Sequence, residues 1–112
     1  MKAFRKAAPK VGKEQFVRYA GVVGDFNPIH YDKDFAESMR MPAVVGQGPL
    51  AMSVALDTLV GEVGIDAIKG FGCRVTSPMF PDLDLEVVSE QDGTVNLMNG
   101  DTAVIMGKAT PR

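Results

Sequence analysis

The stretch "GQGPLAMSVALDTLVGEVG", residues 46–64, decides the fold of this chain. Pro49 suits the first turn of a helix, where a backbone N–H has no partner inside the helix. After it, apolar side chains surround most of the helix instead of forming one stripe: Leu50, Ala51, Met52, Val54, Ala55, Leu56, Leu59, Val60 and Val63. A helix that is apolar nearly all round is typical of a protein interior. The stretch therefore predicts a long, buried helix.

Two shorter helices are predicted before this one. "VGKEQFVRYAGVVGD", residues 11–25, carries apolar side chains after a polar start, and Gly21 and Gly24 are expected to loosen its end. "HYDKDFAESM", residues 30–39, is the second, with Asp32 as its N-cap. Pro42 closes this helical unit.

The pattern changes to strands after Gly64. "GFGCRVTSPMF" (70–80) and "LDLEVVS" (83–89) are typical of strands, and the second alternates apolar and polar residues imperfectly. "QDG" (91–93) and "NGD" (99–101) are turn signals around the strands "TVNLM" and "TAVIMGKA". Helices followed by an antiparallel meander predict an α+β fold in which the sheet curls round the apolar helix. Because the last strands are short, their edges are candidates for pairing with a partner subunit.

Length and composition indicate a single globular domain. The chain has 112 residues, 46% of them hydrophobic and 23% charged, so one domain over residues 1–112 is expected. A net charge of -2 gives no reason to expect nucleic acid or a membrane surface as a partner. Positive charge gathers near the start, either as a solvated, partly frayed terminus or as a patch for a nucleotide-bearing substrate: Lys2, Arg5, Lys6, Lys10 and Lys13.

Cysteine and histidine are each present once, as Cys73 and His30. A lone cysteine cannot form an internal disulfide, and the two together cannot build a zinc site of the usual Cys/His type. Residues 1–13 lack the apolar core of a secretory signal, and no apolar run approaches the ~18 residues that span a bilayer. We therefore expect a cytoplasmic protein.

The segment "GDFNPIHYDKDF", residues 24–35, holds the candidate chemistry. An imidazole can take and give a proton near neutral pH, and Asp25 precedes His30 by five residues. Pro28 restricts Asn27 to extended geometry, which lowers the entropic cost of directing both side chains at one small space. A water molecule held between them could be activated for attack. The alternative is an ordinary turn with a local His–Asp hydrogen bond.

A second element, "VVGQGPL", places Gly46 and Gly48 just before the long helix. The N–H groups at a helix start are unpaired and carry the positive end of the helix dipole. They are suited to stabilising a thioester oxygen that gains negative charge as an enolate forms. Because Pro49 cannot donate, the Gly48 N–H is the candidate donor. The alternative is that both glycines serve only the tight turn into a buried helix.

With these residues in view, "YAGVVGDFNPIHYDKDFAESMRMPAVVGQGPLAMSVAL", residues 19–56, resembles the signature region of the MaoC-like dehydratases, the R-specific enoyl-CoA hydratase group. The resemblance implies the hot-dog fold, usually as a dimer or double hot dog, and a role in fatty acid metabolism. It implies addition of water to a trans-2-enoyl thioester of coenzyme A or acyl carrier protein, giving an (R)-3-hydroxyacyl thioester, or the reverse. It implies no metal and no redox cofactor.

Carried over by position, the resemblance makes Asp25 and His30 the catalytic pair, with Asp25 as base and His30 as acid. Asn27 matches the asparagine that shapes the site, and Gly48 the glycine whose N–H binds the thioester oxygen. The family usually has a His-Gly-Met-like sequence at the start of the helix, where this chain has Gln47, Gly48 and Pro49. The strands in "TVNLMNGDTAVIMGKA" also look short for the family.

Two other functions stay open from the sequence. A hot-dog thioesterase would release a free thiol, and a non-catalytic subunit would support a catalytic hot-dog partner. On the long helix, Ser53 and Asp57 could face an acyl pocket, although polar side chains in helices more often bond locally.

Overall fold

A curved antiparallel sheet and one long helix make up most of the molecule. The computed structural model describes all residues, 1–112. Along the chain the elements are β1 (Phe4–Ala7), α1 (Lys13–Val23), the 3-10 turn η1 (Pro28–His30), α2 (Lys33–Ser38), α3 (Gly48–Val63), the 3-10 turn η2 (Ile65–Ala67), β2 (Ile68–Val75), β3 (Leu85–Ser89), β4 (Thr94–Asn99) and β5 (Thr102–Pro111). The five strands follow the order β1-β3-β4-β5-β2, and every neighbouring pair is antiparallel.

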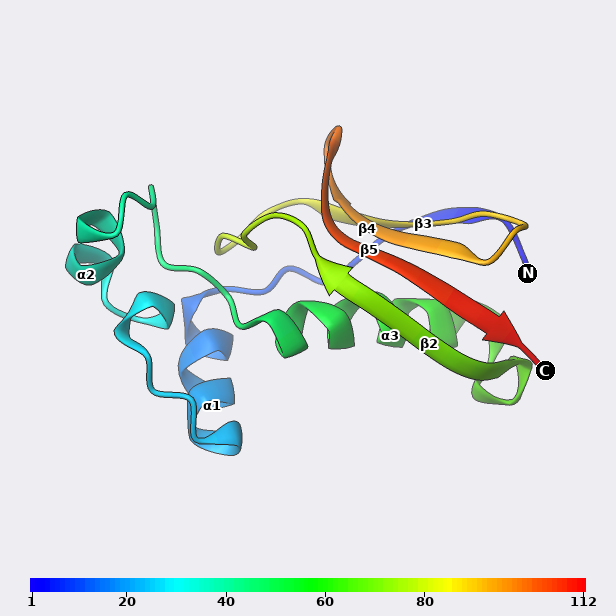
Figure 1. Cartoon of the computed structure of the whole chain (residues 1–112), viewed down its shortest axis with the longest axis horizontal. Coiled ribbons are helices and arrows are strands. Elements are labelled where there is room, and N and C mark those ends of the chain that lie inside the picture. The colour runs from blue at the N-terminus through cyan, green and yellow to red at the C-terminus, as the bar shows by residue number, and fades with distance from the viewer.

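The helices divide between the two ends of the molecule. Figure 1 shows α3 lying along one face of the sheet, while α1 and α2 gather at the end opposite the two chain termini. The loops that join these helices therefore meet near the first turn of α3. All three predicted helices are present, and Asp32 caps α2 by accepting a hydrogen bond from the Phe35 N–H at 3.2 Å.

The predicted meander is confirmed in β3, β4 and β5. Leu85, Val87 and Ser89 alternate as buried residues along β3, and each turn contains a glycine in the left-handed region, Gly93 at φ 97° and Gly100 at φ 59°. A residue with a β-carbon is strained in that region, so these glycines fix where the strands reverse.

The first predicted strand ends earlier than expected. β2 covers Ile68–Val75, whereas the pattern predicted a strand over residues 70–80. Pro78 and Pro81 have no N–H to give to a sheet, so the chain leaves the ladder before them. Met79, between them, is nevertheless only 2% exposed and belongs to the core.

The prediction that the long helix is buried all round is wrong for the single chain. One face of α3 packs against the sheet through Ala51, Ala55 and Leu59, which are at most 1% exposed. On the other side, Met52 is 36% exposed and Leu56 is half-buried. The five-stranded sheet is wide enough to cover one side of the helix only.

The basic start of the chain is also more ordered than a frayed terminus. Residues 4–7 form β1, which pairs with β3. The amines of Lys6 and Lys2 contact the Glu62 carboxylate at 2.8 and 3.3 Å, and their hydrogen bonds hold the pKa of Glu62 below its ordinary value. Arg5 and Lys10 contact Glu86 and Asp84 at 3.5 and 3.3 Å, so acidic neighbours offset much of this positive charge.

Candidate active site

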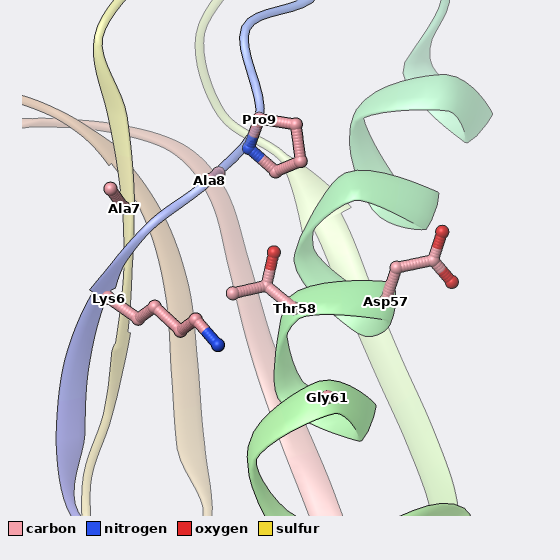
Figure 2. Close-up of a pocket in the computed structure, with 7 residues that line it drawn as sticks. All are labelled: Lys6, Ala7, Ala8, Pro9, Asp57, Thr58 and Gly61. Carbon is pink, nitrogen blue, oxygen red and sulfur yellow. The ribbon is translucent and has the colours of Figure 1, made fainter.

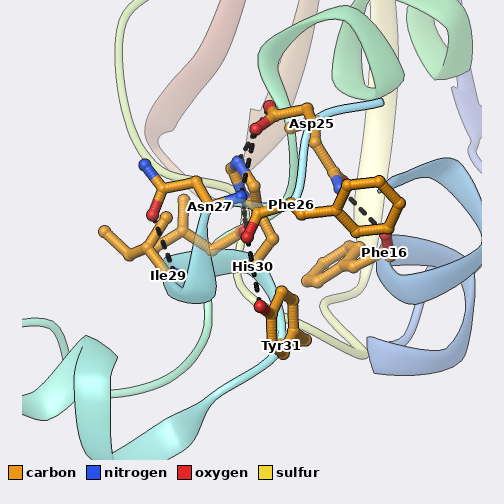
Figure 3. A network of polar contacts seen from close by, with 9 residues as sticks. Phe16, Asp25, Phe26, Asn27, Ile29, His30 and Tyr31 are labelled. Carbon is orange, nitrogen blue, oxygen red and sulfur yellow. Dashed lines mark hydrogen bonds and ion pairs between the residues drawn. The ribbon is translucent and has the colours of Figure 1, made fainter. Parts of the chain in front are cut away.

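The histidine and the carboxylate predicted to act together do lie together. Helix α1 ends at Gly24, whose φ of 73° turns the chain, and Asp25 follows directly. His30 closes the short turn η1, and its Nε2 lies 3.2 Å from the Asp25 Oδ2 (Figure 3).

Hydrogen bonds between side chains and the main chain hold the loop that carries Asp25 and His30. The Asn27 side-chain oxygen accepts from the Ile29 N–H at 3.1 Å, and the Asn27 N–H donates to the Asp25 Oδ1 at 3.3 Å. The Tyr31 hydroxyl donates to the Phe26 carbonyl at 3.1 Å. Asn27 therefore folds the loop through its side chain and contacts Asp25 through its main-chain N–H.

The other imidazole nitrogen has a fixed partner that sequence reasoning missed. The His30 Nδ1 lies 2.6 Å from the carbonyl oxygen of Val45. A carbonyl can only accept, so Nδ1 carries a proton and donates it. The imidazole nitrogen left to face Asp25 is then Nε2. The sequence carries no signal for this contact, because it depends on the Val45 main chain and not on its side chain.

The start of α3 presents an unpaired backbone donor. Gly48 is the first residue of the helix, no side chain caps it, and Pro49 has no N–H. The Gly48 N–H has no acceptor within the chain. Three residues earlier, Val45 is bonded to His30, so the short segment 45–48 links the imidazole to this donor.

The two glycines of this segment have different packing. A β-carbon on Gly46 would lie 2.7 Å from the Met79 Cε and 2.9 Å from the buried Phe16 ring, so packing disfavours a larger residue at Gly46. A β-carbon on Gly48 would meet only the Val75 Cγ2, at 3.2 Å. The alternative that these glycines serve only the tight turn into α3 is thus better supported for Gly46 than for Gly48.

The site is open to solvent on one side. The Asp25 side chain is 47% exposed and that of His30 is 12% exposed. The surface of the chain has four hollows, and neither Asp25 nor His30 lines any of them. The flanking apolar residues Val22, Val23 and Phe26 are 79%, 50% and 61% exposed. A single chain therefore aligns the polar groups without enclosing an acyl chain.

The two polar residues of α3, Ser53 and Asp57, have different surroundings. The Ser53 hydroxyl donates to the Pro49 carbonyl at 3.0 Å, which is the local bond expected of it. Asp57 lines a hollow of about 410 Å³ between β1 and α3, together with Lys6 and Thr58. In Figure 2, Thr58 points toward β1 and the Asp57 carboxylate points away from Lys6.

Two further features concern metals and membranes. Nowhere in the chain do three or more His, Cys, Asp or Glu side chains gather closely enough to share a metal ion. None of its helices combines the length and the apolar character that crossing a bilayer requires.

Comparison with known proteins identifies the family. A family model described as "MaoC like domain" matches residues 2–110, nearly the whole chain. The chain belongs to the MaoC-like domain family. The fatty acid synthase beta subunit TOXC of Cochliobolus carbonum is 31% identical to this MaoC-like chain over 83 residues, which are 71% of the chain and 4% of that protein. The chain thus spans about 4% of the length of the curated relatives it matches.

Solved structures show the fold. The R-hydratase PhaJ1 from Pseudomonas aeruginosa, in its unliganded form, gives a TM-score of 0.76 at 20% identity, covering 96% of this chain and 77% of that one. The (R)-hydratase from A. caviae involved in PHA biosynthesis gives a TM-score of 0.76 at 23% identity, covering 96% and 91%. The curved sheet and α3 of the MaoC-like chain therefore form the hot-dog fold, and the predicted family and fold class are confirmed.

Proposed function

We propose that residues 1–112 form one domain that hydrates trans-2-enoyl thioesters to (R)-3-hydroxyacyl thioesters, or catalyses the reverse dehydration. The family is that of hydratases and dehydratases, which supports the reaction class. The observation that carries the proposal is the 3.2 Å contact between Asp25 and His30, with Nδ1 of His30 occupied by the Val45 carbonyl.

The proposed chemistry starts from an Asp25 carboxylate and a doubly protonated His30. Asp25 removes a proton from water as the water oxygen attacks C3 of the enoyl group. The double-bond electrons move toward the thioester carbonyl, whose oxygen gains negative charge and is stabilised by the Gly48 N–H. The Nε2 proton of His30 then bonds to C2, and the carbonyl re-forms.

The same pair can reset itself after each turnover. Hydration leaves Asp25 protonated and His30 neutral, with its Nε2 lone pair free. Because Oδ2 and Nε2 lie 3.2 Å apart, a small realignment of the two groups lets the proton return from the carboxyl to the imidazole. No step in this sequence needs a redox cofactor or a metal.

The substrate and the assembly are part of the same proposal. The acyl group would arrive as a thioester of coenzyme A or acyl carrier protein in the cytoplasm. A homodimer or larger homo-oligomer would cover the exposed side of α3 and close the open side of the site. Such an assembly buries apolar residues that one chain leaves in water, including Met52 and Phe26.

Activity on crotonyl-CoA tests the proposed function. Adding the purified protein should remove the absorbance of the conjugated enoyl thioester. Asp25→Asn and His30→Ala should each lower kcat by about a hundredfold or more, since general acid–base groups contribute about that much. Asp34→Asn, which changes an exposed carboxylate on α2, is the matched control and should leave kcat unchanged. Wild-type rates in both site variants would refute the mechanism.

A second function is favoured by the open site. Because one chain does not enclose the Asp25–His30 pair, the chain could be a subunit that works only with a catalytic hot-dog partner. To test this function, the chain is purified with and without a co-expressed hot-dog neighbour. The mass of each preparation and its activity on crotonyl-CoA then distinguish such a subunit from a chain that is active alone. A thiol-reactive dye in the same assay separates the thioesterase alternative, because hydration releases no thiol.

A further inference from the structure

One buried polar side chain beside the site is not explained by packing. Gln47 is 1% exposed and stands at the N-cap of α3, yet its side chain does not cap the helix. Its amide nitrogen donates to the Phe16 carbonyl in α1 at 2.8 Å. Its amide oxygen is buried and has no hydrogen-bond partner within the chain. A buried acceptor without a partner destabilises the folded state, so stability alone does not favour this residue.

The amide of Gln47 completes a set of hydrogen bonds on consecutive residues. The Val45 N–H donates to the Ile29 carbonyl at 2.9 Å, and the Val45 carbonyl accepts from His30 at 2.6 Å. The Gly46 N–H donates to the Met79 carbonyl at 2.8 Å. The segment 45–47 is therefore bonded to η1, to the loop after β2 and to α1, immediately before the free Gly48 N–H.

Of these hydrogen bonds, only the one from the Gln47 side chain reaches α1. The ring of Phe16, which is 0% exposed, would touch a β-carbon on Gly46, so α1 meets the segment through both its side chain and its main chain. Helix α1 leads through Gly24 into Asp25. The Gln47 amide thus connects the element that carries Asp25 to the segment that orients His30 and ends in the Gly48 donor.

We propose that Gln47 is a positioning residue for the reaction, holding α1 against the start of α3 so that Asp25, His30 and the Gly48 N–H keep one geometry. This inference rests on the proposed hydration. A misplacement of about 1 Å in such a group can lower the rate a hundredfold. Removing the amide should therefore change the chemical step more than it changes substrate binding.

The test compares two buried side chains that donate to main-chain carbonyls. Gln47→Met keeps the length and volume of the side chain and removes the hydrogen bond. Ser89→Ala is the matched control, because the Ser89 hydroxyl is also buried and donates to the Lys2 carbonyl at 2.8 Å, in β3 and away from the site. Ser89→Ala should lower Tm, whereas Gln47→Met should change Tm little, because it removes the unpaired amide oxygen together with the hydrogen bond. Only Gln47→Met should lower kcat, by about ten- to a hundredfold with a small change in KM.

Two additional variants and one spectroscopic measurement complete the test. Gln47→His can still donate one N–H to Phe16 and should restore kcat to within about threefold of wild type. Gln47→Asn keeps an amide, but its shorter side chain no longer reaches the Phe16 carbonyl. It should therefore lose activity as Gln47→Met does. If Gln47→Met does not fold, the activity of Gln47→Asn decides whether the positioning role holds. Imidazole ¹⁵N shifts of His30 should move in Gln47→Met and stay in place in Ser89→Ala.

The outcomes separate the two proposals. If the wild-type chain does not hydrate crotonyl-CoA, the proposed function fails, and the ¹⁵N shifts still report whether Gln47 positions His30. If wild type is active and Gln47→Met matches Ser89→Ala in kcat and in the His30 shifts, the positioning role is overturned.

Discussion

At the scale of single residues, the site depends on which atoms the backbone leaves free. The Val45 carbonyl occupies the His30 Nδ1, so Nε2 is the imidazole nitrogen that is left to face Asp25. The Gly48 N–H is free because Gly48 is the first residue of α3 and no side chain caps the helix. The Val45 carbonyl and the Gly48 N–H are both main-chain groups, and the side chains of these two residues take no part.

Residue-scale electrostatics also make a prediction about acid stability. Hydrogen bonds from Lys6 and then Lys2 lower the pKa of Glu62 from its ordinary 4.5 in the folded chain. A carboxyl whose folded pKa is lowered stabilises the protein above its unfolded pKa, and this contribution is lost as the pH falls through the folded pKa. Glu62→Gln should therefore destabilise the chain at neutral pH, and this effect should disappear as the pH falls through the lowered pKa of Glu62 in the folded chain.

Urea unfolding at several pH values checks this. The difference between wild type and Glu62→Gln should narrow as the pH falls below 4.5. In a Lys6→Met background the dependence should be smaller, because the leading cause of the shift is gone. A difference that is constant with pH would contradict the assignment to this carboxylate.

At the scale of elements, helix α1 and its termination show what local sequence can specify. Gly21 and Gly24 were both predicted to loosen its end. Gly21 instead lies inside the helix, where a β-carbon would meet nothing within 4 Å, and Gly24 ends it with φ 73°. The two glycines look alike in the sequence and have opposite structural roles.

Alanine substitutions should separate these roles. Gly21→Ala should stabilise the chain by about 0.5–1 kcal/mol, because alanine loses less backbone entropy in a helix. Gly24→Ala should destabilise it by about 1 kcal/mol, because an alanine is strained in the left-handed region. Urea unfolding monitored by circular dichroism measures both, and effects of the same sign would show that the end of α1 is misassigned.

At the scale of the whole molecule, one chain forms a thin, two-layer body. Its extents are 44 × 29 × 19 Å, and only 23 of its 112 residues are buried. The sheet covers one side of α3, and Figure 1 shows no element of this chain lying on the other side. The apolar composition of α3 therefore exceeds what its own sheet can bury, which supports the proposed oligomer.

The oligomer is tested on the uncovered side of α3. Met52→Glu places a charge on a residue that is 36% exposed in the single chain and would be buried in the proposed assembly. It should shift the mass measured by sedimentation toward the monomer and lower hydratase activity with it. Lys33→Glu, on the exposed surface of α2, is the control and should change neither. A wild-type chain that sediments as an active monomer would rule out a site completed by a second copy.

The sequence by itself did not indicate β1, but it determined the three helices, the strands and turns that follow them, and the closeness of Asp25 to His30. These are local properties: Pro49, Asp32 and the glycines at 93 and 100 act through nearby backbone, and the Asp25–His30 offset is bridged by a short, hydrogen-bonded loop. Only the tertiary structure decided that Val45 sets the imidazole, that Gln47 ties α1 to α3, and that one side of α3 stays exposed. Those contacts join segments distant in sequence, and they depend on how far a sheet of five strands can curve around one helix.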